Sequence, residues 1–242
     1  MHRRALLQAL VVALSLLPGK RSFARVESIQ RLLEQIDSDF RATAASTGLA
    51  APSAAVRRAL ERVPRDRFVD ENFASRAWDN RPLPIGHGQT ISQPFIVALM
   101  TELLRPTRDH IVLEVGTGSG YQAAILAECV AKVYSIEIVP ELAQRARKVL
   151  DALGYRNIET RTGDGYAGWL DAAPFDGIIV TAAPDHVPPK LIEQLKPGAR
   201  MVIPVGSSAN DQRLLVVQKD ATGHAITQQT LDVRFVPLTR SR

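Results

Sequence analysis

The sequence predicts an α/β fold: a doubly wound, mostly parallel sheet with helices on both faces and an N-terminal helical appendage. Three observations lead to this prediction. From residue 110 onward, short apolar runs alternate with helical segments, which is the pattern of a parallel sheet. A glycine-rich turn, Gly116–Gly120, separates the first apolar run from the helix after it. Between residues 26 and 40, apolar side chains recur at helical spacing.

The elements expected before residue 107 are three helices and a loop. The first helix is the amphipathic segment at residues 26–40, and the second is the short segment Ala54–Arg62. Residues 81–89 contain two prolines and two glycines, which predicts a structured loop. Pro94 then opens a helix that runs to about Leu104.

The elements expected after residue 107 form the core of the sheet. The predicted strands are Ile111–Val115, Val133–Ile138, Ile158–Thr162, Gly177–Thr181, Arg200–Val205, Leu214–Gln218 and Val233–Pro237. The predicted helices are Tyr121–Cys129, Glu141–Leu153 and Pro189–Leu195, the last closed by Lys196-Pro197-Gly198.

The glycine turn is the first candidate binding element. Glycines after a strand let a ligand approach the backbone at a helix N-terminus. Glu137, 21 residues after Gly116, is placed to accept hydrogen bonds from ribose hydroxyl groups. The dinucleotide fingerprint requires a third glycine at position 121, where this chain has Tyr121. A tight turn without a ligand is the alternative.

The spacing Glu-x-Gly-x-Gly-x-Gly from Glu114 to Gly120 resembles the motif of Rossmann-like S-adenosylmethionine-dependent methyltransferases. In that superfamily an acid after the third strand accepts a hydrogen bond from the adenine amino group, and Asp164 occupies this position. Asp164 could instead satisfy the backbone of its own turn. The resemblance implies these cofactor-binding residues: Glu114, Gly116, Thr117, Gly118, Ser119, Gly120, Glu137, Asp164 and Gly165.

The most distinctive segment is Arg76–Pro94. Ser92 lies just before Pro94 and could simply cap a helix, but that leaves Gly86 and Gly88 unexplained. Together with this segment, further motifs form a pattern across residues 54 to 239: Val63–Asp70, Ala77–Asn80, Leu83–Pro94, Met100–Leu104, Gly116–Tyr121, Ile178–Pro184 and Val233–Leu238. In these segments the chain resembles the protein-L-isoaspartate O-methyltransferase family.

The resemblance implies methyl transfer from S-adenosylmethionine to the free α-carboxylate of L-isoaspartyl residues in damaged proteins and peptides, which initiates their repair. Ser92 matches the family's active-site serine, and the implied substrate-binding residues are Thr90, Ile91, Ser92 and Gln93. Another acceptor, or a non-catalytic protein that binds S-adenosylmethionine, are the alternatives.

The expected chemistry needs neither a metal nor a general base. A free α-carboxyl group has a pKa of about 3.3–3.7, so it is already ionised at neutral pH. What remains is to align the reactants and to exclude water. We therefore expect Ser92 to donate a hydrogen bond that orients the carboxylate, assisted by Thr90 and loop amides, rather than to act as a nucleophile.

Charge and composition limit the classes of partner and the kinds of site that the chain can have. The net charge is +5, but residues 1–24 carry +4 and no acid, so the other 218 residues sum to +1. A near-neutral body disfavours nucleic acid as a partner. The single cysteine, Cys129, excludes a disulfide framework, and the five histidines include no pair at metal-ligand spacing. We expect a monomer without stable membrane association whose partners are isoaspartyl-containing proteins.

Residues 1–24 have the layout of a secretory signal: a basic start, a 13-residue apolar run and small residues before a possible cleavage site. An N-terminal helix that packs on the body, or an upstream start codon, would also explain them. The methyl donor is made inside the cell, so we expect a cytoplasmic enzyme, with export as the alternative. The predicted divisions are a leader (1–24), N-terminal helices with the acceptor-site loop (25–106), a cofactor-binding core (107–206) and C-terminal strands that complete the sheet (207–242).

Overall fold

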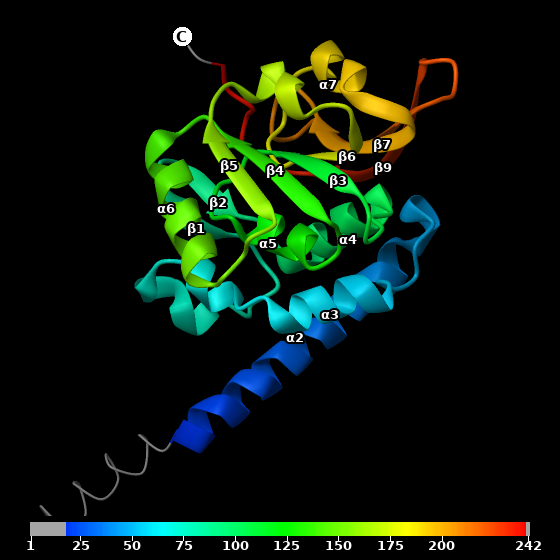
Figure 1. The fold of residues 1–242 in the computed structure, drawn as a ribbon. Coiled ribbons are helices and arrows are strands. Elements are labelled where there is room, and N and C mark those ends of the chain that lie inside the picture. Colours follow the sequence, from blue (N-terminus) through cyan, green and yellow to red (C-terminus); the bar gives the residue numbers. More distant parts are fainter. Residues whose placement is uncertain (1–17, 241–242) are drawn as a thin grey trace, which may run out of the picture.

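The computed structural model describes residues 18–240 and their side chains from Arg25 onward (Figure 1). Residues 1–17 of the predicted leader lie outside the described residues. The backbone of residues 18–24 belongs to helix α2 (Pro18–Thr47), whose N-terminal end projects away from the body. Within the described part of the chain, no helix is long and apolar enough to cross a membrane.

The predicted fold class is confirmed. A seven-stranded sheet has the order β5-β4-β3-β6-β7-β8-β9, in which the first five strands are parallel and β8 and β9 are antiparallel additions. The chain moves outward from β3 to β5, then crosses back to β6. The strands are β3 (Ile111–Val115), β4 (Lys132–Glu137), β5 (Ile158–Thr162), β6 (Phe175–Val180), β7 (Leu195–Val205), β8 (Gln212–Lys219) and β9 (Ala225–Val233).

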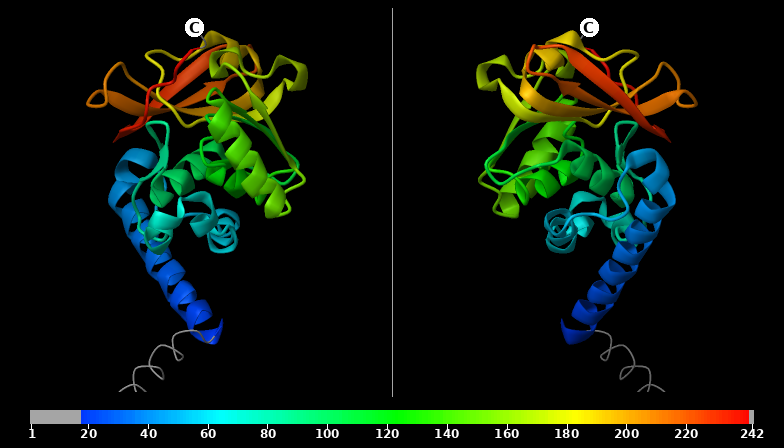
Figure 2. Two further views of the ribbon diagram at one scale, coloured as in Figure 1. Left: turned by 90° about the vertical axis from the view of Figure 1, so that its left-hand side faces the viewer. Right: turned by 90° about the vertical axis from the view of Figure 1, so that its right-hand side faces the viewer.

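Helices cover both faces of the sheet unequally (Figure 2). One face packs against α4 (Pro94–Leu104), α5 (Tyr121–Ala127) and α6 (Pro140–Ala152), and the other against α7 (Pro189–Glu193). Successive strand residues alternate between the two cores. The two cores share the central strands, which explains why those strands read as continuous apolar runs.

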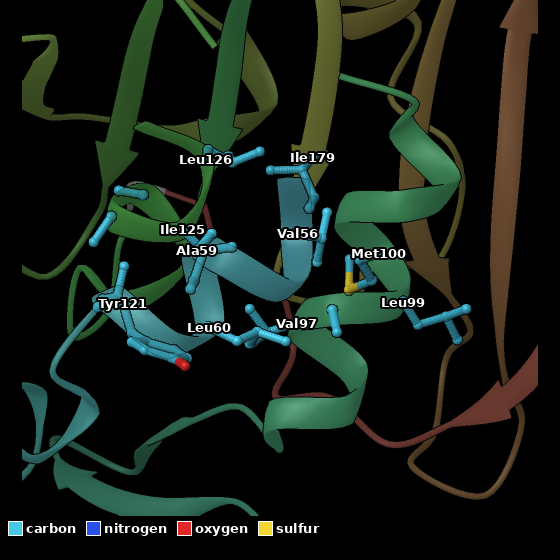
Figure 3. Close-up of a cluster of buried hydrophobic side chains, with 14 of the residues drawn as sticks. Val56, Ala59, Leu60, Val97, Leu99, Met100, Tyr121, Ile125, Leu126 and Ile179 are labelled. Carbon is cyan, nitrogen blue, oxygen red and sulfur yellow. The ribbon is translucent and has the colours of Figure 1, made fainter. Parts of the chain in front are cut away.

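The N-terminal helices form an outer layer beyond α4 and α5. Residues of α3 (Ala54–Arg62), α4 and α5 interdigitate in one buried cluster that reaches Ile179 of β6 (Figure 3). The face of α2 that the sequence predicts to be apolar is buried here: Leu32, Leu33, Ile36 and Phe40. The appendage is therefore part of the core that supports the sheet.

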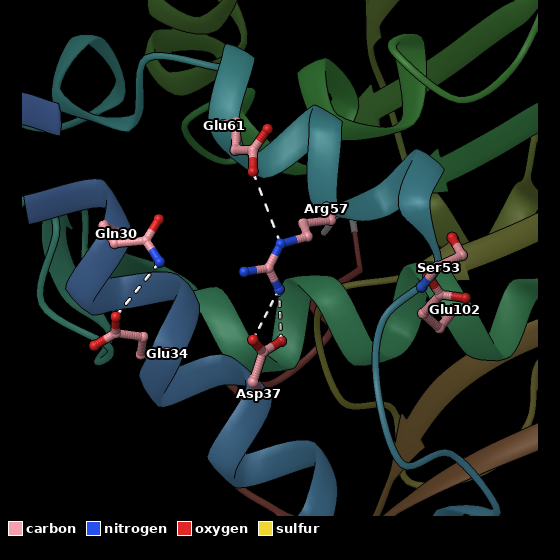
Figure 4. Close-up of polar contacts among 7 residues, drawn as sticks. All are labelled: Gln30, Glu34, Asp37, Ser53, Arg57, Glu61 and Glu102. Carbon is pink, nitrogen blue, oxygen red and sulfur yellow. Dashed lines mark hydrogen bonds and ion pairs between the residues drawn. The ribbon is translucent and has the colours of Figure 1, made fainter. Parts of the chain in front are cut away.

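Polar contacts fix the order of these helices (Figure 4). Arg57 of α3 donates to both carboxylate oxygens of Asp37 of α2, each at 2.8 Å. The amide of Ser53 donates to Glu102 of α4 at 2.5 Å, and the Ser53 hydroxyl accepts from the Val56 amide. Helix α3 is thus linked to α2 through Arg57, and its N-cap residue Ser53 is linked to α4.

Some predicted boundaries are wrong. Of the strand expected at Val233–Pro237, only Val233 is in a strand, as the last residue of β9. The rest of β9 is mostly exposed and polar, so it gives no apolar alternation. Helix α5 ends at Ala127 rather than Cys129, and α7 ends at Glu193, because β7 already begins at Leu195. Cys129 is buried, and burial raises the pKa of its thiol to about 11.

Candidate active site

The glycine turn lies where the strand order reverses. Strand β3 lies between β4 and β6. From β3 the chain continues to β4 and β5 on one side, and then crosses to β6 and β7 on the other. Ligands of open α/β sheets bind in the crevice at the carboxyl ends of such strands. Gly116–Gly120 follows β3, Glu137 ends β4, and Thr181 follows β6. Residues 116–119 of the turn, Glu137 and Thr181 line one cleft, whereas Gly120 lies outside its lining.

The backbone of this turn requires glycine. Gly116, Gly118 and Gly120 have φ values of +97°, +52° and +89°, a region that side-chain-bearing residues rarely adopt. A Cβ atom on Gly116 would lie 2.4 Å from Thr181 Oγ1, which donates to Gly116 O at 2.6 Å. Thr181, which follows β6, therefore packs against the turn and leaves no room for a side chain at Gly116.

Glu137 lies at the cleft with only 6% of its surface exposed. Its Oε2 accepts from the amide of Gly118 at 2.7 Å, and its Oε1 accepts from the amide of Val139 at 2.9 Å. Each carboxylate oxygen can accept a further hydrogen bond. Glu137 thus holds the glycine turn and keeps acceptor capacity on its cleft side.

Glu114 is one of the residues expected to bind the cofactor, but it does not line the cleft. It is 0% exposed and lies below the turn, outside the lining of the cleft. Its Oε2 accepts a short hydrogen bond from Ser135, whose hydroxyl oxygen is 2.6 Å from Thr117 Oγ1. Burial raises the pKa of Glu114 to about 8, although the Ser135 hydroxyl opposes the shift. Glu114 supports the turn through two hydroxyl groups.

Asp164 also lies outside the lining of the cleft. Its Oδ1 accepts from the amide of Tyr166 at 2.9 Å and caps the short helix η4 (Gly165–Ala167). Gly165 does reach the cleft, and a Cβ atom there would lie 2.3 Å from Val115 Cγ1. Contact between Asp164 and adenine stays a prediction.

The loop that contains Ser92 is a β-hairpin. Strands β1 (Leu83–Gly86) and β2 (Gln89–Ile91) pair in an antiparallel arrangement, and His87 forms the turn between them with a φ of +52°. Ser92 does not cap α4, because the N-cap is Gln93 and the Phe95 amide donates to Asn80 Oδ1 at 3.0 Å. The hydroxyl group of Ser92 is therefore available for another role.

Ser92 lies between two adjoining cavities. The first is the cleft of the glycine turn, and the second is a cavity of about 530 Å³ bounded by the hairpin, α4 and the segment after β9. Four residues line both: Thr90, Ser92, Thr181 and Val236. Ile91 is buried and lines only the first cavity, whereas Gln93 lines only the second.

The second cavity has one unpaired charge. Asp232 is 3.2 Å from Arg213 Nε, whereas Arg234 forms no ion pair with any described residue. The four shared residues are uncharged. Positive charge therefore lies at the second cavity, away from the wall that the cavities share. Among the described residues no group of three histidine, cysteine or acidic side chains could hold a metal ion.

Comparison with known proteins agrees with this geometry. The sequence model of the protein-L-isoaspartate(D-aspartate) O-methyltransferase family matches residues 44–242. The chain belongs to this family. Protein-L-isoaspartate O-methyltransferase 2 of Syntrophobacter fumaroxidans is 55% identical over 86% of this chain and 85% of its own length. The enzyme of the same name from a Polaromonas species is 53% identical over 87% of this chain and 100% of its own length.

Solved structures of the family share the fold. One protein-L-isoaspartate O-methyltransferase superimposes with a TM-score of 0.74 at 26% identity, over 85% of this chain. This chain spans 65% of the length of that structure. A Plasmodium falciparum protein, crystallised with S-adenosyl-L-homocysteine, superimposes with a TM-score of 0.69 at 23% identity, over 78% of this chain and 92% of its own.

Sequence reasoning missed two members of the shared wall. Thr181 ends a strand that the sequence does predict, and the carboxyl ends of parallel strands gather at the binding edge, so this rule could have found it. Val236 follows β9 and is fixed by a hydrogen bond from the Ala183 amide to Val236 O at 2.8 Å. That long-range contact has no local signal.

Proposed function

We infer that this protein transfers a methyl group from S-adenosylmethionine to the free α-carboxylate of L-isoaspartyl residues in damaged proteins and peptides. The observation that carries this inference is the wall shared by the cleft and the adjoining cavity. A group transfer requires donor and acceptor to meet at one surface, and Ser92 stands on that surface. Membership of the family supplies the acceptor class.

The residues of the cleft suit the proposed methyl donor. The left-handed glycine turn presents backbone at a helix N-terminus, and the Glu137 carboxylate faces the same space, as required to bind a ribose. A side chain at Gly116 or Gly165 would collide with Thr181 or Val115. When bound, S-adenosylmethionine supplies an electrophilic methyl group on a positively charged sulfur.

The uncharged shared wall fits the charge changes of this reaction. The carboxylate loses its negative charge as the new bond forms, so a cation beside the reacting oxygen would stabilise the reactants more than the transition state. We propose that Ser92 orients the carboxylate through a neutral hydroxyl group, and that Thr90 assists. The Thr181 hydroxyl is already bonded to Gly116 O, so it shapes the wall.

Arg234 suits the capture of the acceptor, which precedes methyl transfer. Its unpaired guanidinium group lines the acceptor cavity without belonging to the shared wall. We propose that it attracts the anionic acceptor and releases the ester once the charge is lost. Capture and reaction would then use different groups.

The decisive experiment is transfer of labelled methyl from S-adenosylmethionine to a peptide that contains one isoaspartyl residue, with the aspartyl isomer as control. Selective labelling of the isoaspartyl peptide is expected. Equal labelling of both peptides would overturn the inference in favour of another acceptor. Binding of the donor with no transfer to either peptide would favour a non-catalytic protein.

Ser92→Ala tests the role of the shared wall. Because alignment rather than activation is lost, kcat is expected to fall by about 10- to 100-fold while affinity for S-adenosylhomocysteine is unchanged. Ser53→Ala, which removes a hydroxyl group remote from the cleft at the N-cap of α3, is the matched control. A trapped methyl-serine intermediate in the unaltered enzyme would show that Ser92 is a nucleophile instead.

We also propose that residues 25–106 supply the acceptor side, residues 107–206 the cofactor side, and residues 207–242 the strands that complete the sheet. The proposed location is the cytoplasm, where the methyl donor is made, and the proposed active form is a monomer. N-terminal sequencing of the natively expressed protein would distinguish this location from export with loss of the leader.

A further inference from the structure

Arg65 is a buried charge attached to the acceptor loop. It begins the short helix η2 (Arg65–Phe68) and is 0% exposed. Its guanidinium group donates to three backbone carbonyls: Ala77 O, Arg81 O at 3.1 Å and Ser92 O at 3.0 Å. These carbonyls lie before and after the β1–β2 hairpin. One side chain therefore joins both ends of the loop that presents the active-site serine.

The same guanidinium group lies against the cofactor side. Its central carbon is 5.7 Å from the ring centroid of Tyr121, which follows the glycine turn directly and lines the cleft. Phe68, at the other end of η2, packs edge-on against the same ring with a centroid distance of 5.6 Å. Helix η2 thus contacts both the loop that carries Ser92 and Tyr121 of the cofactor cleft.

The energetics indicate that Arg65 does more than fill space. Neither nearby acid forms an ion pair with Arg65. Asp66 pairs with Arg25, and Asp79 pairs with Arg76 and Arg81, although the charge of Asp79 still acts on Arg65 from a greater distance. A buried charge without a carboxylate partner is costly, and apolar side chains of similar volume commonly stabilise a protein better. What arginine alone provides is a planar fork of five donors that can hold several carbonyls in fixed positions.

We propose that Arg65 is a positioning residue that sets the place of Ser92 relative to the glycine turn. This proposal rests on the proposed function, because the serine is taken to orient the acceptor. Arg65 acts through the backbone of the loop and touches neither reactant. Lysine in its place has a charge but no fork, so it cannot bind the three carbonyls in the same geometry.

The first test compares the unaltered enzyme with Arg65→Lys and Arg57→Ala. Arg57→Ala is the matched control, because it removes a part-buried arginine and its ion pair with Asp37 without touching the loop. Arg65→Lys is expected to lower kcat by about 10- to 100-fold, with affinity for S-adenosylhomocysteine close to the original value. Arg57→Ala is expected to lose stability but keep its kcat.

Chemical rescue separates position from packing. Millimolar guanidinium is expected to restore part of the kcat of Arg65→Ala, since the ion can occupy the space of the missing side chain. No restoration in a folded variant would count against the proposal. If Arg65→Ala does not fold, Arg65→Lys alone decides. Wild-type kcat in Arg65→Lys, or an equal loss of kcat in Arg57→Ala, would overturn the proposal.

A readout that needs no reaction distinguishes this proposal from the proposed function. Amide hydrogen exchange in the presence of S-adenosylhomocysteine is expected to accelerate in Arg65→Lys within residues 77–92, and to stay unchanged in α2. Uniform acceleration, or none, would overturn the positioning role. Absence of methyl transfer by the unaltered enzyme would instead contradict the proposed function, and the exchange result would still stand.

Discussion

The buried carboxyl group of Glu114 predicts that the stability of this protein falls as pH rises. Burial raises its pKa from an ordinary value near 4.5 to about 8 in the folded state. Between these values the folded protein keeps a proton that the unfolded chain has released. Unfolding is then linked to proton release, so the free energy of unfolding decreases with increasing pH. The loss begins near pH 4.5 and is complete above about pH 8.

The size of the effect follows from the same two pKa values. Each unit of difference corresponds to 1.36 kcal/mol, so the upper limit is about 5 kcal/mol. Glu114→Gln removes the titration and keeps the shape of the side chain, and the Ser135 hydroxyl can still donate to the amide oxygen. Relative to the unaltered protein, the variant is expected to gain several kcal/mol of stability between about pH 5 and about pH 8.

Urea unfolding of both proteins across this pH range measures the difference directly, because every other titrating group is common to both. Glu193→Gln, on the exposed surface of α7, controls for the exchange of residue type. The reasoning is refuted if the stability difference between the unaltered protein and Glu114→Gln does not change with pH. Glu114 would then have the same ionisation state in the folded and unfolded protein.

Two further substitutions test the two sides of the site. Gly116→Ala is expected to lose about 2–3 kcal/mol of stability, because of its positive φ and because the new Cβ atom displaces the Thr181 hydroxyl group. The same variant is expected to bind S-adenosylhomocysteine more weakly, as measured by calorimetry. Gly154→Ala has a similar φ and nothing within 4 Å, so an equal loss in both variants would exclude the collision. Arg234→Gln is expected to raise KM for an isoaspartyl peptide by about two- to fivefold, to leave kcat unchanged and to weaken the salt dependence of KM. Arg147→Gln on α6 is the control of equal charge, and a lower kcat in Arg234→Gln would contradict a role confined to capture.

The central strands could be predicted because both of their faces are buried. Strand β3 begins and ends at the expected residues, and β6 differs by only a few. The edge strand β5 also has the expected bounds, although none of its residues is fully buried. Strand β9 could not be predicted, because Thr227–Thr230 is a polar edge whose pairing depends on β8 rather than on its own pattern. The apolar residues after it cover the cleft instead of forming a strand.

The candidate site divides in the same way. The turn of Gly116–Gly120, Glu137 and the hairpin residues could be found from spacing and resemblance, because short-range geometry fixes them. The position of Glu114 could not be predicted. The motif shows that an acid is needed there, but not that its carboxyl group accepts a hydrogen bond from Ser135. Arg65 was not singled out either, because its partners are up to 27 residues away along the chain.

The N-terminal end of the long helix α2 projects away from the body that carries the candidate site. Its 30 residues span about 45 Å, and its fully buried side chains begin at Leu32, with Ile29 partly buried against the same core. Cleavage after residue 24 would leave Arg25 in place, with its contacts to Asp66 and Trp78. Removal of α2 up to residue 24 is therefore expected to keep the buried face of α2 in contact with the body.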